Sequence, residues 1–191
     1  MILYFQKIYL RFPISQFSDI IINHTERLIY MEIRKTRSDE LETLMKMYEN
    51  ARIFMAENGN PDQWGKKYPE RSVIASDIDS GCSYICEHCG RIIAVFYYKT
   101  GPDDTYLHIR NGRWLNDLPY GVVHRIVSDG TVKGAASFCL DWAFSQCGNL
   151  KIDTHTDNKI MQHLLEKNGF KYCGIINTDD GTERMAYQKE M

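Results

Sequence analysis

The amino-acid sequence predicts one domain of mixed α/β class, built from layers of strands and helices. The chain has 191 residues, a length that can bury one good hydrophobic core and gives no reason to expect two domains. Hydrophobic residues make up 43% and charged residues 25% of the chain, which is an ordinary globular composition. From Met31 onward, strand-like and helix-like patterns alternate, and this alternation indicates a layered α/β structure.

The first expected elements are a strand over residues 32–36 and a long helix after it. Ser38 is the expected N-cap of this helix, because acidic residues follow it in the first turn, where they favour the helix dipole. Apolar residues then recur at helical spacing as far as Met55, and the Asn58–Gly59 pair provides a stop. After a turn, Pro69 suits the first position of a second helix that runs to about residues 80–81.

The next two expected strands cover residues 83–87 and 91–99 and are joined by a tight turn. The second of them holds a nearly continuous apolar run, which suits a strand covered on both faces. The remaining expected elements are a short strand at 105–109, a strand at 120–128, a helix at 134–147, a strand at 150–154, a helix at 157–168, and strands at 170–176 and 184–188.

The first thirty residues differ from the rest of the chain. They are rich in Ile, Phe and Tyr but are interrupted by charges, and they lack both the roughly 18 uninterrupted apolar residues of a membrane helix and the small-residue ending of a signal peptide. Met31 then opens a segment that resembles the natural start of a domain. We expect residues 1–30 to be an N-terminal extension outside the domain and residues 31–191 to form the domain; a peripheral strand or hairpin packed on the domain is the alternative for the extension.

Charge and cysteine content argue against several classes of protein. The formal net charge is −2 and the basic residues are scattered, so we expect no nucleic-acid partner and no membrane partner. Six cysteines occur without a secretory signal, and two of them fall within an expected amphipathic helix, where thiols behave as small hydrophobes. We therefore expect a reduced, cytoplasmic protein.

A phosphate-binding helix start is the first chemical feature of the sequence. A strand ends near Ser128, and a glycine-containing loop leads into a helix that begins with small residues. Such a helix start presents unpaired backbone amides and the positive end of a dipole, to which a phosphate can bind. The small residues leave room for a ligand, and Lys133 adds a positive charge; by itself, this pattern is more often simple packing.

A second stretch of sequence makes the interpretation as a phosphate-binding site more specific. Asn158 begins a helix that ends in the run Leu164-Leu165-Glu166-Lys167-Asn168-Gly169-Phe170. An early Asn followed by an E-K-x-G-F turn and a strand resembles the GNAT superfamily of acetyl-CoA-dependent N-acetyltransferases. The resemblance covers residues 31–191 in element order and about residues 120–175 in motif detail. In the phosphate loop, Thr131 stands where that family has Gln or Arg, and the segment before the loop is about two residues shorter.

The resemblance implies a fold and a set of coenzyme contacts. The fold would be a central mixed, mostly antiparallel sheet of about six or seven strands flanked by helices. Acetyl-CoA would be the co-substrate, and no metal is expected. The implied contacts fall on the strand edge, the phosphate loop and the helix that follows: Ile126, Val127 and Ser128 for the pantetheine arm and acetyl group, Lys133, Gly134, Ala135, Ala136 and Ser137 for the pyrophosphate, and Asn158 for the pantetheine.

The implied reaction is direct attack of an amine on the thioester in a ternary complex. A base must take the proton of the amine, and His124 and His155 are the two candidates, because imidazole titrates near neutrality. Many relatives have a Tyr as the acid at the position of Leu165, so either Tyr172 fills that role or the thiolate leaves without an acid. Strand alternation places Arg125 on the face opposite His124.

Two other functions stay open at this stage. Thr131 and Leu165 are compatible with a catalytically inactive acyl-CoA-binding or regulatory module. Cys82, Cys86 and Cys89, with His88, superficially resemble a metal cluster, but no second pair of ligands follows at zinc-site spacing. The acceptor is expected to be a small-molecule or peptide amine bound near the loops at 60–67 and 106–120, and a homodimer is the default assembly.

Overall fold

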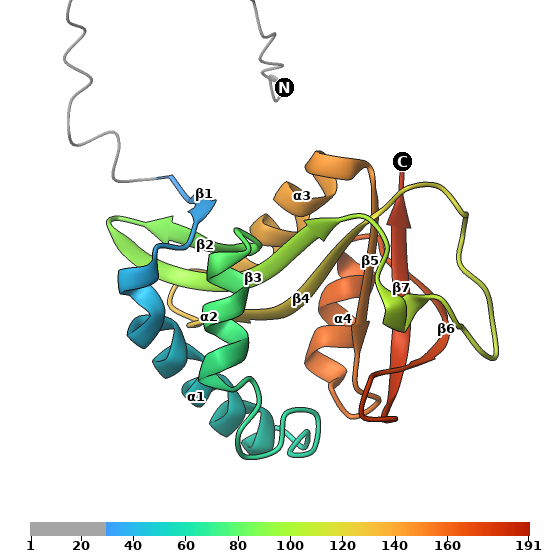
Figure 1. Cartoon of the computed structure of the whole chain (residues 1–191), viewed down its shortest axis with the longest axis horizontal. Coiled ribbons are helices and arrows are strands. Elements are labelled where there is room, and N and C mark those ends of the chain that lie inside the picture. The colour runs from blue at the N-terminus through green and yellow to red at the C-terminus, as the bar shows by residue number, and fades with distance from the viewer. Residues whose placement is uncertain (1–29) are drawn as a thin grey trace, which may run out of the picture.

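The computed structural model describes residues 30–191, which form one seven-stranded sheet with helices on both faces (Figure 1). The expectation for the N-terminal extension falls on residues 1–29, outside the described residues. The elements in chain order are β1 (Glu32–Lys35), η2 (Ser38–Glu40), α1 (Leu41–Glu57), α2 (Arg71–Asp79), β2 (Ser83–His88), β3 (Arg91–Thr100), η3 (Asp104–Tyr106), β4 (Gly121–Ser128), α3 (Ala135–Cys147), β5 (Asn149–Thr154), α4 (Lys159–Lys167), β6 (Lys171–Asn177) and β7 (Glu183–Glu190).

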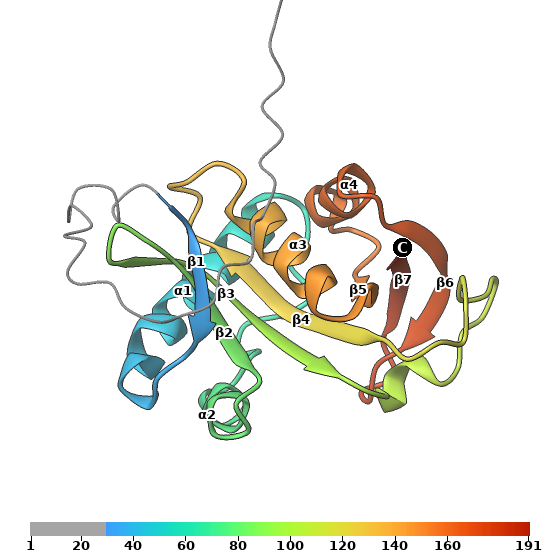
Figure 2. The same ribbon diagram turned by 90° about the horizontal axis from the view of Figure 1, so that it is seen from above.

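The strand order is β1-β2-β3-β4-β5-β7-β6, and every neighbouring pair is antiparallel except β4 with β5. This confirms the expected central mixed, mostly antiparallel sheet of six or seven strands. Helices α1 and α2 cover one face of the sheet, and α3 and α4 cover the other (Figure 2). Among the described residues, no helix is long and apolar enough to cross a membrane.

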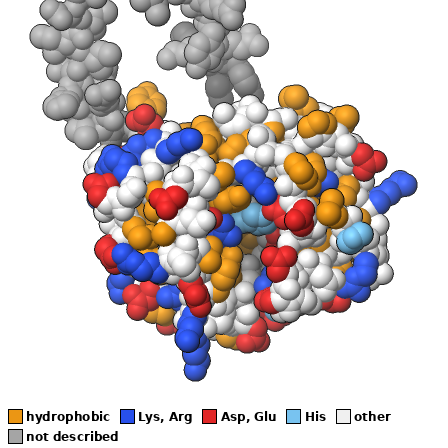
Figure 3. All heavy atoms as spheres, viewed as in Figure 1, with side chains coloured by type: hydrophobic (Ala, Val, Ile, Leu, Met, Phe, Trp, Pro, Cys, Tyr) orange, Lys and Arg blue, Asp and Glu red, His pale blue; other side chains and the backbone are white. Residues whose placement is uncertain are grey.

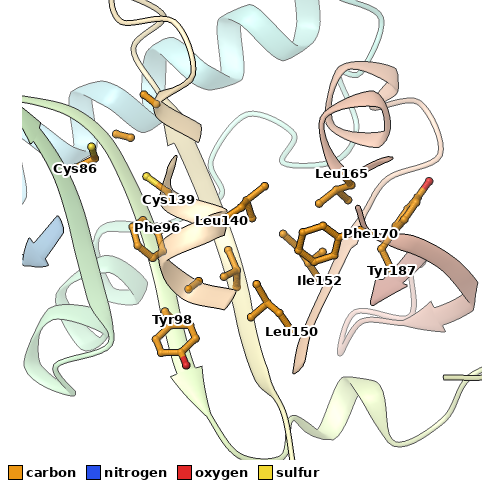
Figure 4. Packing of buried hydrophobic residues seen from close by; sticks show 14 of the residues in the cluster. Cys86, Phe96, Tyr98, Cys139, Leu140, Leu150, Ile152, Leu165, Phe170 and Tyr187 are labelled. Carbon is orange, nitrogen blue, oxygen red and sulfur yellow. The ribbon is translucent and has the colours of Figure 1, made fainter. Parts of the chain in front are cut away.

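Two hydrophobic clusters hold these layers together. The larger one joins α3 and α4 to the sheet, and Figure 4 shows Leu150 and Ile152 of β5 between Leu140 of α3 and Leu165 of α4. The smaller cluster packs α1 and α2 against the opposite face of β2, β3 and β4. Side chains alternate between the two clusters in the middle of β3, as the pleat of a sheet requires: Val95 belongs to the smaller cluster, and its neighbours Ala94 and Phe96 belong to the larger one.

Most elements lie where the sequence predicts them, and the differences are local. The first helix begins with a 3₁₀ turn whose N-cap is Arg37 and not Ser38, because the Glu40 carboxylate accepts a hydrogen bond from the Arg37 backbone amide at 2.8 Å. Helix α2 begins at Arg71, with Glu70 as its N-cap, two residues after the expected start at Pro69. The strand expected at 105–109 is wrong: Asp103 accepts a hydrogen bond from the Thr105 amide at 3.1 Å and starts the 3₁₀ turn η3 in its place.

The parallel pair β4 and β5 separates almost as soon as it forms. Register is kept for two pairs, Gly121 with Leu150 and Val122 with Lys151. Beyond Val122, residues 123–128 of β4 run beside no strand on this side, although their other edge is paired with β3. The sheet therefore splits between its β1–β4 half and its β5–β7 half, and the backbone of β4 faces the split.

Candidate active site

A cavity of about 1220 Å³ lies at the split in the sheet. Residues 123–128 of β4 and 152–154 of β5 line it, together with side chains from α1, α4 and the loop at 58–70. The space-filling view in Figure 3 shows this hollow near the centre of the visible face, with histidine atoms inside it and acidic side chains around it. The volume is that of a pocket for a small molecule or a coenzyme arm.

His124 lies in the wall of the cavity between two carboxylates. Its Nε2 is 3.1 Å from Oδ2 of Asp103, and its Nδ1 is 3.6 Å from Oδ1 of Asp153. The three side chains are largely buried, with 21%, 14% and 13% of the side chain exposed for His124, Asp103 and Asp153. An imidazole held in this way is fixed in orientation, and each of its ring nitrogens has a carboxylate as neighbour.

Each carboxylate of this Asp103–His124–Asp153 cluster is itself fixed by neighbours. The buried Tyr106 hydroxyl donates a hydrogen bond to Oδ1 of Asp153 at 2.8 Å. Asp103 accepts hydrogen bonds from the amide and the hydroxyl of Thr105, at 3.1 and 2.5 Å. The hydrogen bond from His124 holds the pKa of Asp103 well below its ordinary value, although burial opposes the shift. Asp103 is therefore a carboxylate throughout the neutral range.

A β-bulge places His124 and Arg125 on the same side of β4. Tyr97 of β3 pairs with His124 and Val95 pairs with Val127, so two residues of β4 oppose one of β3. Arg125 has a φ of 51°, in the left-handed region. The ring of Tyr97 lies 5.8 Å from the His124 ring and 4.7 Å from the Arg125 guanidinium carbon. The prediction that Arg125 faces away from His124 is thus wrong, because the bulge interrupts the alternation of side chains.

Five of the nine predicted coenzyme residues line the cavity: Ile126, Val127, Ser128, Ala136 and Asn158. The other four, Lys133, Gly134, Ala135 and Ser137, lie at the start of α3 but outside the cavity lining. Gly134 is the N-cap of α3, with a φ of 88° and no side-chain cap. The start of α3 thus has no side-chain cap, and the binding of a phosphate there stays a prediction.

The loop that precedes α3 is shaped by Asp129. Its carboxylate accepts hydrogen bonds from the Thr131 amide at 2.9 Å and from the Thr131 hydroxyl at 2.7 Å. Thr131, the departure from the family pattern, therefore stabilises the loop conformation and leaves the glycines exposed.

Asn158 has two roles in the fold. Its side-chain oxygen accepts a hydrogen bond from the Met161 amide at 3.0 Å and so caps α4. Its amide donates to the side chain of Gln63 at 2.8 Å, which connects α4 to the loop at 58–70. Asn158 lines the cavity beside that loop, and it is the predicted contact that the coenzyme arm would meet there.

Two predicted catalytic residues are not brought together with His124. His155 does not line the cavity; it pairs with Asp157, whose carboxylate lies 3.5 Å from its Nδ1. Tyr172 is 47% exposed on β6, packs edge-on against Tyr187 and also lies outside the lining. Leu165, which stands at the position of the acid in many relatives, is completely buried in the larger cluster (Figure 4).

Sequence reasoning missed Asp103, Asp153 and Tyr106. Asp103 and Tyr106 belong to a polar loop in which no pattern distinguishes one acidic or aromatic residue from another. Asp153 did carry a signal, because a charged residue in a strand that is otherwise buried usually has a partner or a function. Of the two tryptophans considered for the acceptor loops, Trp64 lines the cavity, whereas Trp114 packs against Tyr106 at 5.4 Å between ring centroids.

The cysteine-rich stretch does not form a cluster. Cys86 is buried in the larger hydrophobic cluster, Cys82 is half-buried and Cys89 is exposed. In the described part of the chain, no group of three or more His, Cys, Asp or Glu side chains is arranged to hold a metal ion.

Comparison with known proteins identifies the fold. No family model and no curated protein matches the chain. Among solved structures, an acetyltransferase of the GNAT family from Streptococcus agalactiae is 31% identical, with a TM-score of 0.78 over 84% of this chain and 95% of that one. A putative acetyltransferase from Salmonella typhimurium, solved with acetyl-CoA, has a TM-score of 0.57 at 11% identity, over 84% of this chain and 93% of that one.

A NatC complex solved with a peptide and CoA has a TM-score of 0.56 at 13% identity, over 85% of this chain and 99% of that one. At such low identity the last two structures support the fold alone. The similarity to the Streptococcus agalactiae protein is strong enough to assign the family. The chain belongs to the GNAT family of acetyltransferases.

Proposed function

We propose that the chain is an acetyl-CoA-dependent N-acetyltransferase that acts on a positively charged amine, with His124 as general base. The observation that carries this proposal is the position of His124, clamped between Asp103 and Asp153 in the wall of a cavity that opens onto the free edge of β4. The first part of the proposal concerns the coenzyme, the second the base and the third the acceptor.

The coenzyme fits the split in the sheet. Backbone groups of residues 123–128 have no strand partner toward β5, and they can pair with the amide groups of an extended pantetheine arm. Ile126, Val127 and Ser128 would hold that arm together with Asn158, and the uncapped start of α3 near Lys133 would receive the pyrophosphate. No metal takes part in this proposal.

The base would act by taking one proton from the acceptor. The reacting amine loses its first proton to solvent, and its neutral nitrogen then attacks the thioester carbon; a carbon–nitrogen bond forms, the carbon–sulfur bond breaks, and the coenzyme leaves as a thiolate. His124 takes the proton from the nitrogen, and the imidazolium that results is stabilised by Asp103 and Asp153. Tyr172 and Leu165 lie outside the cavity lining, and a thiol is acidic enough to leave as a thiolate, so in this proposal the coenzyme takes its proton from solvent.

The acceptor would be cationic because the cavity is acidic. Both arginines of the lining are already paired, Arg125 with Asp77 at 2.8 Å and Arg184 with Asp153 at 4.0 Å. The lining contains more than three times as many aspartates as arginines: Asp62, Asp77, Asp103, Asp129, Asp153, Asp179 and Asp180 against Arg125 and Arg184. A carboxylate on the acceptor would be repelled here, and a second ammonium group would be attracted.

The test is a turnover assay with thiol detection on a matched pair of acceptors, 1,4-diaminobutane and 4-aminobutanoate, each with acetyl-CoA. We expect the diamine to be acetylated with a kcat/KM at least tenfold higher. His124→Gln should lower kcat/KM by about 10²- to 10⁴-fold, the usual contribution of a general base. His155→Gln should leave kcat/KM near the wild-type value, because His155 lies outside the cavity.

Binding of acetyl-CoA without any thiol release from a broad amine panel would overturn the catalytic proposal. It would leave a coenzyme-binding module, the function that the buried Leu165 is compatible with. Equal loss of activity in the two histidine variants would exclude His124 as the specific base.

A further inference from the structure

Arg125 adopts a backbone conformation that needs support. Its φ of 51° is one that residues with a Cβ rarely adopt, and it marks the bulge in β4. Positive-φ residues other than Gly persist where surrounding contacts fix them, and they gather at functional sites. Arg125 lines the cavity between the base His124 and the coenzyme segment that starts at Ile126.

The side chain of Arg125 is held from three parts of the chain. Its Nε and Nη2 donate to the two carboxylate oxygens of Asp77 on α2, at 2.9 and 2.8 Å. Its Nη1 donates to the hydroxyl of Tyr68 at 3.0 Å, and its guanidinium carbon lies 4.7 Å from the Tyr97 ring centroid. In addition, the buried Tyr48 hydroxyl of α1 donates to the carbonyl oxygen of Arg125 at 3.2 Å.

These contacts commit three of the five N–H groups of the guanidinium within the protein. Each of its three nitrogens already donates a hydrogen bond, and the side chains of Arg125 and Asp77 are 13% and 11% exposed. Two parallel hydrogen bonds from a guanidinium to one carboxylate, as between Arg125 and Asp77, fix the position and the orientation of the arginine side chain strongly. The arginine therefore acts on the backbone from which it extends.

We propose that the Arg125–Asp77 ion pair holds the β4 bulge in its observed conformation. Through the bulge, the ion pair fixes both the orientation of the His124 side chain and the position of the backbone edge that binds the coenzyme. With the bulge, His124 faces Asp103 and Asp153, and the backbone of Ile126 is displaced from regular pairing with β3. Without the bulge, side-chain alternation would shift by one residue between His124 and Val127. The inference rests on the proposed function, because it takes the free edge of β4 as the coenzyme site.

The experiment compares three variants, Arg125→Gly, Arg125→Ala and Asp77→Asn, in the full chain. Glycine removes the ion pair but adopts a positive φ freely, so the bulge remains accessible; alanine removes the ion pair and keeps the Cβ that opposes the bulge. We expect Arg125→Ala to bind acetyl-CoA about tenfold more weakly than Arg125→Gly by calorimetry, from the usual cost of a left-handed L-residue. Asp77→Asn, which keeps the size of the side chain, should weaken binding in the same direction.

A role in stability alone would separate the two measurements. Arg125→Ala would then melt at a lower temperature than Arg125→Gly, because its Cβ opposes the positive φ, but the folded forms of the two variants would bind acetyl-CoA equally well. Affinity for acetyl-CoA in Arg125→Ala equal to or better than that in Arg125→Gly overturns the inference.

Spectra of the protein without coenzyme separate this inference from the proposed function. In the apo protein, amide resonances of Ile126, Val127 and Ser128 and the His124 ring resonances should keep their wild-type positions in Arg125→Gly and move in Arg125→Ala. If Arg125→Ala does not fold, the same shifts are expected in Asp77→Asn. Failure of the wild type to bind acetyl-CoA refutes the proposed function, whereas unmoved resonances in both Arg125→Ala and Asp77→Asn refute the lock on the bulge.

Discussion

Tyr106 supplies a buried hydrogen bond whose loss can be estimated from the structure. The residue is 2% exposed, and its hydroxyl donates to Oδ1 of Asp153 at 2.8 Å. Burial raises the pKa of Tyr106 well above its ordinary value, so the phenol stays a neutral donor at every working pH. In Tyr106→Phe the aromatic ring remains, and Asp153 keeps only its more distant neighbours, His124 at 3.6 Å and Arg184 at 4.0 Å.

Hydrogen bonds to charged groups contribute about 1.5 to 3 kcal/mol, so we expect Tyr106→Phe to lower the free energy of unfolding by about 2 kcal/mol. For a domain of this size that loss corresponds to a fall in Tm of roughly 4 to 8 °C. Urea unfolding followed by tryptophan fluorescence gives the free energy, and a thermal melt gives the Tm. kcat should also fall, since Asp153 loses the donor that orients it beside His124.

Tyr120→Phe is the matched control, because it too removes one hydroxyl and keeps the ring. The Tyr120 hydroxyl accepts a hydrogen bond from the Asp103 backbone amide at 3.2 Å, and such a bond between neutral groups contributes about 0.5 to 1.5 kcal/mol. The reasoning is refuted if Tyr106→Phe costs less than about 0.5 kcal/mol or no more than Tyr120→Phe, since Asp153 would then not depend on the phenol.

Two further predictions concern stability away from the base. Gly112→Ala would place a Cβ against the carbonyl oxygen of Cys173 on β6, so we expect a loss of about 1 to 3 kcal/mol in urea unfolding; wild-type stability would show that the loop moves away freely. Burial lowers the pKa of Lys151 to about 8, below the value of about 10.4 in an unfolded chain. Between these two values the unfolded state binds more protons, so the free energy of unfolding should rise with pH from about 8 to about 10, and this rise should be smaller in Lys151→Met. Identical slopes in wild type and Lys151→Met, measured by urea unfolding across this range, would contradict the assignment.

The fold follows closely from local sequence patterns. The apolar run of β3 and the helical spacing of α1 are fixed by neighbours in sequence, so they could be predicted from the sequence alone. The start of the first helix could not be predicted, because Ser38 is a good capping residue by itself. In the structure, the hydrogen bond from the Arg37 amide to the Glu40 carboxylate makes Arg37 the N-cap. The strand expected at 105–109 failed for the same reason: the turn set by Asp103 outweighs the weak strand propensity of that loop.

The parts of the site that are adjacent in sequence could be predicted, whereas the contacts between residues distant in sequence could not. His124 and the segment from Ile126 to Ser128 are adjacent in sequence, and the structure places them in one cavity. The partners of His124 come from residues 103 and 153, which no short pattern connects. The bulge is also invisible in the sequence, because a positive φ at an arginine depends on Asp77, nearly fifty residues earlier in the chain.

Because β4 separates early from β5, the cavity has two different walls: one is a main-chain edge and the other is made of side chains. An edge made of main-chain amides and carbonyls offers the same kinds of hydrogen bond whatever side chains it carries, as long as the backbone keeps its shape. The opposite wall of the cavity consists of side chains from separate loops, each of which can change independently. If the proposed function holds, a chain with this architecture can acquire new acceptors by altering its loops while it keeps its donor; the 11% identity to a protein of the same fold shows how far the sequence can diverge while the fold is kept.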